Sequence, residues 1–352
     1  DDAEVVPQGQ QLGMVGRHVS PERGEGLFQL AAHLGRLAPR EANLRTAREA
    51  ACGVRMVGAE ALSAQLERFA GRRERALRLA HVGAAPQQRR AVADRYDADA
   101  ALLDRLKAAV EAHADDIVAA VLRDTRKPEG EIRVTEVMNV VGNIQLNIDS
   151  LEEWMQPTEV TPSKNPDDKA MIIYEARGAC LILGPWNFPL GLVFGPLAAA
   201  VAAGNCCIVK LTDLCPNVAR VAGEIIREVF EENEVALFEG DVSVAEALLE
   251  MPFNHIFFTG STAVGKLVME KAARHLTPIS LELGGKSPAI VDETADIPLA
   301  AKRIAWGKFL NCGQTCVAPD YVLVHQNREQ PLLEALIESI RMLYGSAPLV
   351  GS

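Results

Sequence analysis

The chain has 352 residues, 48% of them hydrophobic and 24% charged, which is enough for two domains with a large core. A formal net charge of −11 argues against nucleic-acid binding, which requires a basic surface. Gly191, Gly195 and Pro196 interrupt the longest apolar run, so no segment reaches the ~20 residues of a membrane span. The seven cysteines form neither a CxxC zinc pair nor a disulfide framework, which indicates a reducing, cytoplasmic setting without a bound metal.

Residues 1–90 form an unassigned N-terminal segment. They are rich in Arg, Ala and Gln, and the first Lys of the chain is Lys107. Apolar residues at helical spacing within 28–37 and 62–69 predict short amphipathic helices. The chain starts at Asp1 without an initiating methionine or an apolar leader, so we interpret it as a fragment or a processed form.

Two long amphipathic helices are predicted after residue 99. Apolar residues between Leu102 and Leu122 recur at helical spacing, and Pro128 ends this helix. A second helix is predicted over residues 134–151, where apolar residues step by three and four. We expect both helices to cover one face of a sheet.

Strands and helices alternate from residue 176 onward. Buried strands are predicted at 179–184, 205–210, 236–240 and 253–260, with a helix at 218–230. A β-α-β order of this kind predicts an α/β fold with a parallel, Rossmann-like sheet, although the G-x-G-x-x-G fingerprint is absent.

A glycine-rich turn follows the last of these strands and opens a helix. Free N–H groups and the helix dipole at such a turn favour a pyrophosphate. The candidate cofactor residues of the turn are Gly260, Ser261, Thr262, Ala263, Val264 and Gly265. The same stretch, GSTAVGK, also fits the P-loop of an NTPase, but Leu267 stands where magnesium binding requires Ser or Thr. A P-loop NTPase is therefore the weaker alternative.

Three residues outside this turn carry candidate chemistry. Cys316 is a candidate nucleophile, although Cys312 in the same loop has an equal claim on spacing alone. Glu282, at the end of an apolar run, is a candidate base that could activate water. Asn187 follows a strand, where it either forms a turn or stabilises an oxyanion.

Four motifs that hold these residues occur in a characteristic order: GPWNFP, FTGSTAVG, LELGGKSP and GQTC. In this order they resemble the aldehyde dehydrogenase superfamily, far more specifically than one glycine pattern would. The runs HLTPISLELGGKSP and WGKFLNCGQTCVAPDYVL most resemble its class 3 branch. The resemblance covers roughly residues 99–344.

The resemblance implies NAD(P)-dependent oxidation of an aldehyde to a carboxylic acid through a cysteine thiohemiacetal and thioester. Cys316, the last residue of GQTC, matches the nucleophile, and Glu282 matches the base. Asn187 matches the oxyanion residue, acting together with the Cys316 backbone N–H. The implied cofactor contacts are Trp186, Lys210, Asp213 and the turn at 260–265. NAD is the first expectation, and NADP stays open because Asp213 replaces the longer Glu that the family usually carries.

The resemblance also implies a domain order and partners. We expect a cofactor-binding domain at 91–280, an oligomerisation hairpin at about 154–175, and the N-terminal part of a catalytic domain at 281–352. The implied partners are a small-molecule aldehyde, of medium-chain, fatty or aromatic type, and a second copy in a homodimer. Family members continue beyond this point, so we interpret the chain as truncated at its C-terminus. A catalytically defective fragment that retains nucleotide binding is the alternative.

Overall fold

A computed structural model describes the backbone of residues 13–14, 85–160 and 170–345, with side chains from Asp99 onward. The chain forms two compact units, each described by itself. One unit comprises Gly53–Leu283, and the other comprises Asp1–Cys52 together with Gly284–Ser352. We call them the five-stranded and the three-stranded unit after their sheets. The short helices predicted within 28–37 and 62–69 lie outside the described residues, and the domain boundaries at 90 and 280 stay predictions.

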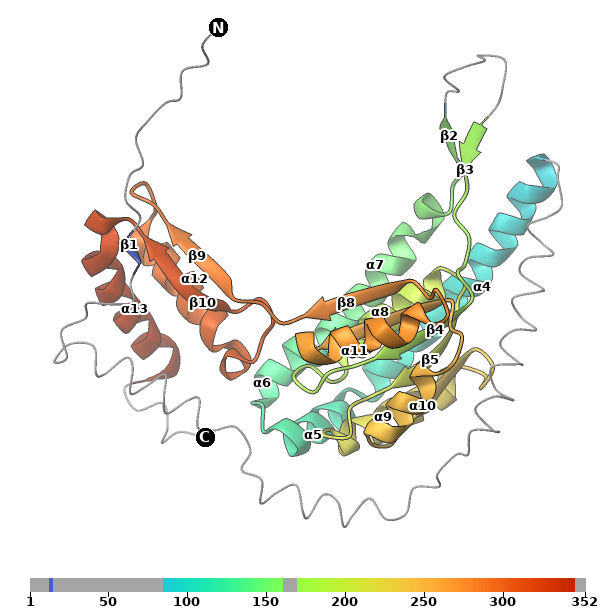
Figure 1. Cartoon of the computed structure of the whole chain (residues 1–352), viewed down its shortest axis with the longest axis horizontal. Coiled ribbons are helices and arrows are strands. Elements are labelled where there is room, and N and C mark those ends of the chain that lie inside the picture. Colours follow the sequence, from blue (N-terminus) through green and yellow to red (C-terminus); the bar gives the residue numbers. More distant parts are fainter. Residues whose placement is uncertain (1–12, 15–84, 161–169, 346–352) are drawn as a thin grey trace, which may run out of the picture. The chain divides into compact units, whose positions relative to one another are not determined.

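The five-stranded unit contains a parallel sheet in the order β6-β5-β4-β7-β8 (Figure 1). Its strands are β4 (Ala179–Leu183), β5 (Cys206–Lys210), β6 (Val235–Phe238), β7 (His255–Gly260) and β8 (Ile279–Leu283). The helices that follow the first four strands are α8 (Gly191–Ala202), α9 (Pro216–Val229), α10 (Val242–Leu249) and α11 (Thr262–Ala273). The predicted α/β class is confirmed, and the strand order reverses between β4 and β7.

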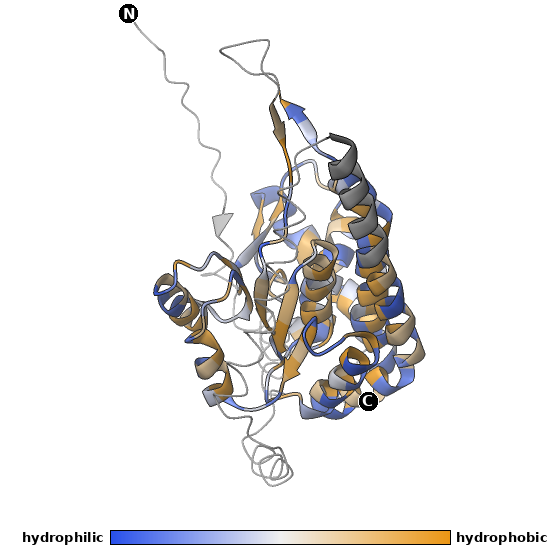
Figure 2. Ribbon diagram, turned by 90° about the vertical axis from the view of Figure 1, so that its right-hand side faces the viewer, coloured by the Kyte–Doolittle hydropathy of each residue, from blue (hydrophilic) through white to orange (hydrophobic). Residues whose placement is uncertain are grey.

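Alternate side chains of each strand point to opposite faces of the sheet, and helices bury both faces. Ile182 and Val209 belong to the core shared with α8 and α9, whereas Leu181 and Ile208 belong to the core shared with α10 and α11. The strands are accordingly apolar along nearly their whole length, as Figure 2 shows by colour.

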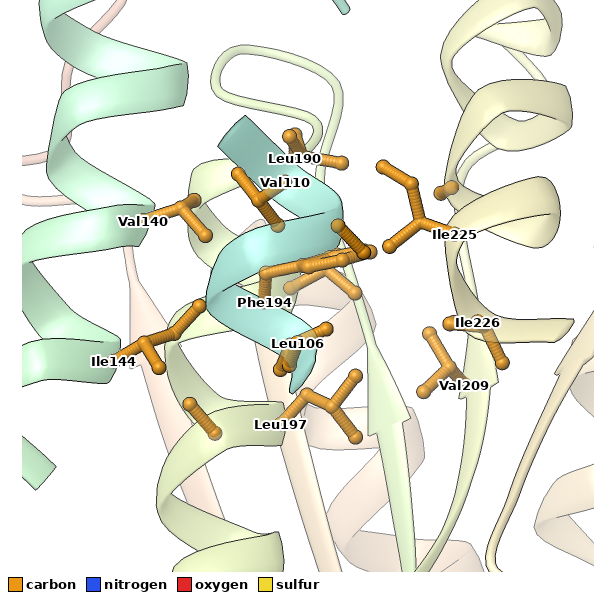
Figure 3. Close-up of a cluster of buried hydrophobic side chains, with 14 of the residues drawn as sticks. Leu106, Val110, Val140, Ile144, Leu190, Phe194, Leu197, Val209, Ile225 and Ile226 are labelled. Atoms are coloured by element: carbon orange, nitrogen blue, oxygen red, sulfur yellow. The ribbon is translucent and has the colours of Figure 1, made fainter. Parts of the chain in front are cut away.

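Phe194 of α8 lies at the centre of the larger core (Figure 3). Its side chain is fully buried among side chains of α4, α7, α9 and β5. The labelled neighbours are Leu106, Val110, Val140, Ile144, Leu190, Leu197, Val209, Ile225 and Ile226. Burial of an aromatic side chain of this size stabilises the fold by roughly 1.5–3 kcal/mol.

The first predicted long helix is two helices in the structure, α4 (Ala85–Ala112) and α5 (Ala114–Thr125). The break lies at His113, whose φ of −92° and ψ of 14° depart from helical values. The break rotates the apolar stripe, so α5 buries Ile117 and Val121, and Leu122 is 45% exposed. The prediction of one uninterrupted apolar face was therefore wrong at its C-terminal end.

The second predicted helix contains a π-helical turn. It runs through α6 (Glu129–Ile132), the π turn η1 (Arg133–Met138) and α7 (Asn139–Trp154). A π turn inserts an extra residue, so helical spacing counted from one side does not continue on the other. Val134, predicted to face the core, is 58% exposed, and the charged Glu136 is buried instead.

A hairpin follows α7, as predicted for residues around 154–175. β2 (Thr158–Val160) pairs antiparallel with β3 (Ala170–Ile172), and all six residues are exposed. In Figure 1 the hairpin extends away from the five-stranded sheet. Its role in oligomerisation stays a prediction.

The three-stranded unit has the sheet order β1-β10-β9. β9 (Ser287–Val291) and β10 (Pro319–Val324) are parallel, and β1 (Gly13–Met14) pairs antiparallel with β10. The other elements of the unit are α12 (Ile297–Phe309), η2 (Leu310–Gly313), η3 (Gln326–Arg328) and α13 (Glu329–Tyr344). A small core packs α12 and α13 on the two longer strands. Across the described residues of both units, no helix has the length and apolarity that a bilayer crossing requires.

The His113 side chain connects the helix break to α9, and this contact predicts a pH dependence of stability. Its Nε2 lies 3.1 Å from Glu228 Oε2, and its Nδ1 lies 3.3 Å from Asp116 Oδ2. Glu228 above all raises the pKa of His113, with a smaller contribution from Asp116, against a lowering by partial burial. A raised pKa adds stability below the unfolded value of 6.5, and the addition is lost as pH rises through the folded value.

We therefore expect the free energy of unfolding of the unmodified protein to exceed that of the His113→Gln variant at pH 6. The difference between the two proteins should shrink by pH 8. Urea denaturation of both proteins at the two pH values measures this difference. A difference that stayed constant or widened with pH would contradict the assigned ion pairs.

Candidate active site

The candidate residues of the five-stranded unit lie along one edge of its sheet. Strands that run parallel end at the same edge, and Asn187 follows β4, Lys210 ends β5 and Ser261 follows β7. Glu282 lies near the end of β8, where it pairs in register with Thr259 of β7. Ligands of doubly wound folds bind at this edge, where the strand order reverses between neighbouring strands. The structure thus brings the predicted cofactor residues and two of the three predicted catalytic residues to one edge.

The loop that follows β4 carries Trp186 and Asn187. Trp186 is 42% exposed, and Asn187 is half-buried. Buried side chains from elsewhere in the unit bind the loop backbone. The Cys215 thiol donates to the Trp186 carbonyl at 3.6 Å, and Lys127 Nζ donates to the Asn187 carbonyl at 3.1 Å. Buried side chains therefore hold the loop backbone in place, while Trp186 remains accessible.

Lys127 and Glu136 form a buried ion pair behind this loop that the sequence analysis missed. Lys127 Nζ lies 3.0 Å from Glu136 Oε1 and 4.1 Å from the centre of the Phe188 ring. Burial raises the pKa of Glu136, while the Lys127 charge and two backbone N–H groups act to lower it. A sequence signal did exist, because Glu136 interrupts the apolar spacing between Ile132 and Val140.

The candidate cofactor residues at the end of β5 and in the loop that follows it differ in exposure. Lys210 is 6% exposed, and desolvation lowers its pKa against the opposing charges of Asp213 and Asp241. Asp213 itself is exposed. A buried ammonium beside accessible carboxylates presents donors and acceptors together, which suits a hydroxyl-bearing ligand.

The turn at 260–265 combines an exposed helix N-terminus with a packing glycine. Ser261 caps α11 by accepting from the Val264 N–H at 3.3 Å, and residues 261–264 are exposed. Gly265 is buried, and a Cβ there would lie 2.8 Å from Leu283 Cδ2. Gly265 therefore lets α11 approach β8, while the residues before it remain exposed at the start of the helix.

The predicted nucleophile, Cys316, lies in the three-stranded unit, in the loop between η2 and β10. Asn311, Cys312 and Gly313 have φ values of 50°, 55° and 77°, so three successive residues are left-handed. Gln314 Nε2 donates to the Asn311 carbonyl at 3.0 Å, and Asn311 Nδ2 donates to the Gln314 carbonyl at 3.3 Å. This strained turn is thus closed by reciprocal side-chain bonds just before Cys316.

The second glycine of LELGGKSP lies against the same loop. A Cβ at Gly285 would lie 3.3 Å from the Cys316 carbonyl oxygen, so a side chain there would crowd the loop. Glu282 is exposed and belongs to the five-stranded unit. The placement of Cys316 relative to Glu282 and Asn187 stays a prediction.

Among the cysteines that the structure describes, three are buried, and two in the loop before β10 are accessible. Burial raises the pKa of Cys180 and Cys215 to about 12, and that of Cys207 well above its ordinary value. A thiol with so high a pKa is not ionised near neutrality and is a poor nucleophile. Cys316 is half-buried and Cys312 is exposed, so both are within reach of a reagent. The described side chains hold no group of three His, Cys, Asp or Glu residues arranged to bind a metal.

The chain thus combines a Rossmann-like parallel sheet, with exposed residues at a helix N-terminus beside its strand-order reversal, and a second, smaller α/β unit that carries Cys316. The chain belongs to the aldehyde dehydrogenase family, whose model matches residues 70–350. The predicted resemblance is confirmed.

Individual relatives support this membership. The chain is 49% identical to the protein AldX of Bacillus subtilis (strain 168) over 240 residues, which are 67% of this chain and 54% of AldX. It is 39% identical to aldehyde dehydrogenase family 3 member A2 of Macaca fascicularis over 244 residues, 69% of this chain and 50% of that protein. It is also 39% identical to the dimeric NADP-preferring aldehyde dehydrogenase of Canis lupus familiaris, over 69% of this chain and 54% of that protein.

A solved structure of the substrate-bound state of Staphylococcus aureus AldH has the same fold. The TM-score is 0.68 at 40% sequence identity, and the match covers 74% of this chain and 56% of that one. The chain thus spans about half the length of the relatives that it matches.

The contrast between buried and accessible thiols predicts the pattern of alkylation. Incubation of the native protein with iodoacetamide near neutral pH is expected to modify Cys316 and Cys312 and to leave Cys180, Cys207 and Cys215 unmodified. Peptide mass spectrometry after timed quenching measures each site. Denatured protein is the control, in which all five should react. Modification of Cys207 as fast as Cys316 in the native protein would contradict the burial described here.

Proposed function

We propose that this protein oxidises an aldehyde to a carboxylic acid with NAD(P) as the hydride acceptor. The observation that carries the proposal is the meeting of the Asn187 loop, Lys210 and the exposed N-terminus of α11 at one sheet edge, in a chain whose family match covers residues 70–350. The weaker alternative of a P-loop NTPase receives no support from this family match.

The residues at the sheet edge fit a dinucleotide. The backbone N–H groups of the exposed residues Ser261, Thr262 and Ala263 suit the pyrophosphate, and the ammonium of Lys210 suits the adenosine ribose hydroxyls. Trp186, 42% exposed on the neighbouring loop, offers a face to the cofactor. When bound, NAD(P) accepts hydride at its nicotinamide ring. We propose NAD first; the shorter Asp213 and the NADP-preferring relative keep NADP as the alternative.

The chain's own residues carry the covalent steps. The Cys316 thiolate attacks the aldehyde carbon, a C–S bond forms, and the carbonyl oxygen takes the negative charge. The Asn187 carboxamide and the Cys316 backbone N–H stabilise this oxygen. Loss of hydride from the same carbon leaves a thioester. Glu282 then takes a proton from water, the resulting hydroxide attacks the thioester, and the acid leaves as the thiolate is restored.

The substrate and the assembly are proposed from the same evidence. We propose a medium-chain, fatty or aromatic aldehyde, in accord with the class 3 motifs. We also propose a homodimer in which the β2–β3 hairpin pairs with a second copy, because its strands are exposed and a relative is dimeric by name. A catalytically defective chain that only binds nucleotide is the alternative.

The nucleophile assignment predicts a difference between two cysteines of one loop. Cys316→Ser should reduce aldehyde oxidation to background, because the hydroxyl is a far weaker nucleophile than the thiolate. Cys312→Ser should retain most of the activity. Absorbance of the reduced nicotinamide with a panel of aliphatic and aromatic aldehydes measures both. Equal loss in the two variants would overturn the assignment. If the unmodified protein binds NAD but oxidises none of the aldehydes, the alternative of a defective chain is favoured.

The role of Glu282 predicts where its variant stalls. Glu282→Gln should form about one equivalent of reduced cofactor in a burst and then stop, because the thioester is no longer hydrolysed. Rapid-quench measurement of reduced cofactor, with mass spectrometry of the acylated Cys316 peptide, tests this expectation. Steady turnover at the unmodified rate would remove Glu282 from the mechanism.

A further inference from the structure

Two buried charges lie behind the Asn187 loop, in a part of the chain distant in sequence. Lys127 precedes α6, and Glu136 lies within the π turn η1. Their side chains are 1% and 0% exposed. Replacement of such a pair by apolar side chains is often neutral for stability, so stability alone does not account for the pair. A π turn in a helix is frequently found at a functional site.

Both charges direct their other bonds at the backbone of one short loop. Lys127 Nζ donates to the Asn187 carbonyl at 3.1 Å and lies over the Phe188 ring. Glu136 Oε2 accepts from the N–H groups of Leu190 and Gly191, at 3.2 and 2.8 Å. The contacts therefore begin at Asn187 itself and end at the first residues of α8.

The start of α8 depends on this arrangement. Leu190 occupies the N-cap of α8 and has no side chain that can accept from the helix N–H groups, so Glu136 does so from another helix. Gly191 allows the close approach, because a Cβ there would lie 3.1 Å from the Thr135 carbonyl and 3.4 Å from Glu136 Oε2. The hydrogen bonds of Glu136 thus hold the π turn close to the loop, and the absence of a side chain at Gly191 makes room for this approach.

We propose that Lys127 and Glu136 are positioning residues, which hold the loop backbone at residues 187–191 and thereby aim the Asn187 carboxamide at the oxyanion. The inference rests on the proposed function and adds two residues to it. A donor that stabilises a developing charge must be held in place before the charge forms. Displacement of such a group by about 1 Å costs up to about a hundredfold in rate. Lys127 and Glu136 touch neither substrate nor cofactor in this account, and they act through Asn187.

The first experiment compares Glu136→Gln with the unmodified protein in steady-state aldehyde oxidation. The neutral amide keeps the shape of the side chain but leaves the Lys127 charge without its partner. We expect kcat to fall about tenfold or more, with the KM for NAD changed less than about twofold. Alkylation of Cys316 should be unchanged, since the nucleophile lies outside the contacts of Glu136. An unchanged kcat would overturn the proposal.

A double-mutant cycle separates positioning from a general loss of stability. Asn187→Ala removes the carboxamide and should lower kcat about a hundredfold. If Glu136 acts through Asn187, the combined variant should be no more than about twofold slower than Asn187→Ala alone. Losses that multiply would show that Glu136 acts by another route and would overturn the proposal.

Asn254→Ala is the matched control. Asn254 Oδ1 accepts from the Ala179 N–H at 2.9 Å, so it makes the same kind of contact at the opposite end of β4. This control should lower the melting temperature without changing kcat. If it lowered kcat as Glu136→Gln does, the effect of Glu136 would be one of general stability, against the proposal.

Hydrogen exchange needs no turnover, so it tests the positioning role of Lys127 and Glu136 separately from the proposed function. Glu136→Gln should speed hydrogen exchange of the Leu190 and Gly191 amides at least about tenfold and leave the β4 amides unchanged. If Glu136→Gln does not fold, the double variant Lys127→Met/Glu136→Leu replaces it, because it buries no unpaired charge. It should also speed hydrogen exchange of the Leu190 and Gly191 amides. If the unmodified protein oxidises no aldehyde, the proposed function fails. Hydrogen exchange alone then tests whether Lys127 and Glu136 hold the loop at residues 187–191. Unchanged exchange at Leu190 and Gly191 overturns this positioning role.

Discussion

Parallel pairing of β4 with both β5 and β7 is the constraint on which the five-stranded unit depends. A parallel strand can be followed by another only through a crossover, so each strand requires a helix that packs back on the sheet. These helices bury both faces, which explains why Ile182 and Leu181 lie in different cores although they are neighbours in sequence. The same pairing places the carboxyl ends of the strands, and thus the loops of this unit that have a candidate role, at one edge. Because the order reverses between β4 and β7, the loops after these two strands diverge and leave the edge accessible between them.

The two helices that start at this reversal are treated in opposite ways. α8 follows β4, and its first N–H groups are bound by the buried carboxylate of Glu136. α11 follows β7, its Val264 N–H is bound by its own Ser261, and residues 261–264 stay exposed. The positive end of α8 is therefore matched by a protein charge, whereas that of α11 remains available to an external anion. At this edge of the sheet, the N-terminus of α8 is thus occupied by Glu136, and the N-terminus of α11 next to it is open to a ligand.

Local sequence patterns were sufficient for the strands but not for the helices that cover them. β4, β5 and β7 are short apolar runs between turns, and their positions followed from the sequence directly. The break at His113 and the π turn around Glu136 were missed, because helical spacing carries no mark of one residue that leaves the helix or is added to it. Glu136 also shows why a buried charge is hard to predict: its partner, Lys127, precedes Pro128, and nothing in the sequence pattern links the two charges. The roles of Asn187, Glu282 and Cys316 came from motif resemblance, since spacing alone gave Cys312 an equal claim.

Burial limits which thiols could serve as the proposed nucleophile, because a buried thiol stays protonated near neutral pH. Cys180 and Cys207 lie opposite each other on adjacent central strands, where burial on both faces raises their pKa and keeps them protonated. Cys215 is equally buried, yet its thiol donates to the Trp186 carbonyl and so supports the Asn187 loop. Cys312 is exposed within a left-handed turn. Cys316 follows that turn at a half-buried position, which gives a reagent access and still allows the protein to surround the thiolate. Burial thus keeps Cys180, Cys207 and Cys215 protonated and leaves Cys312 and Cys316 accessible, and the proposed choice of Cys316 over Cys312 rests on the GQTC motif.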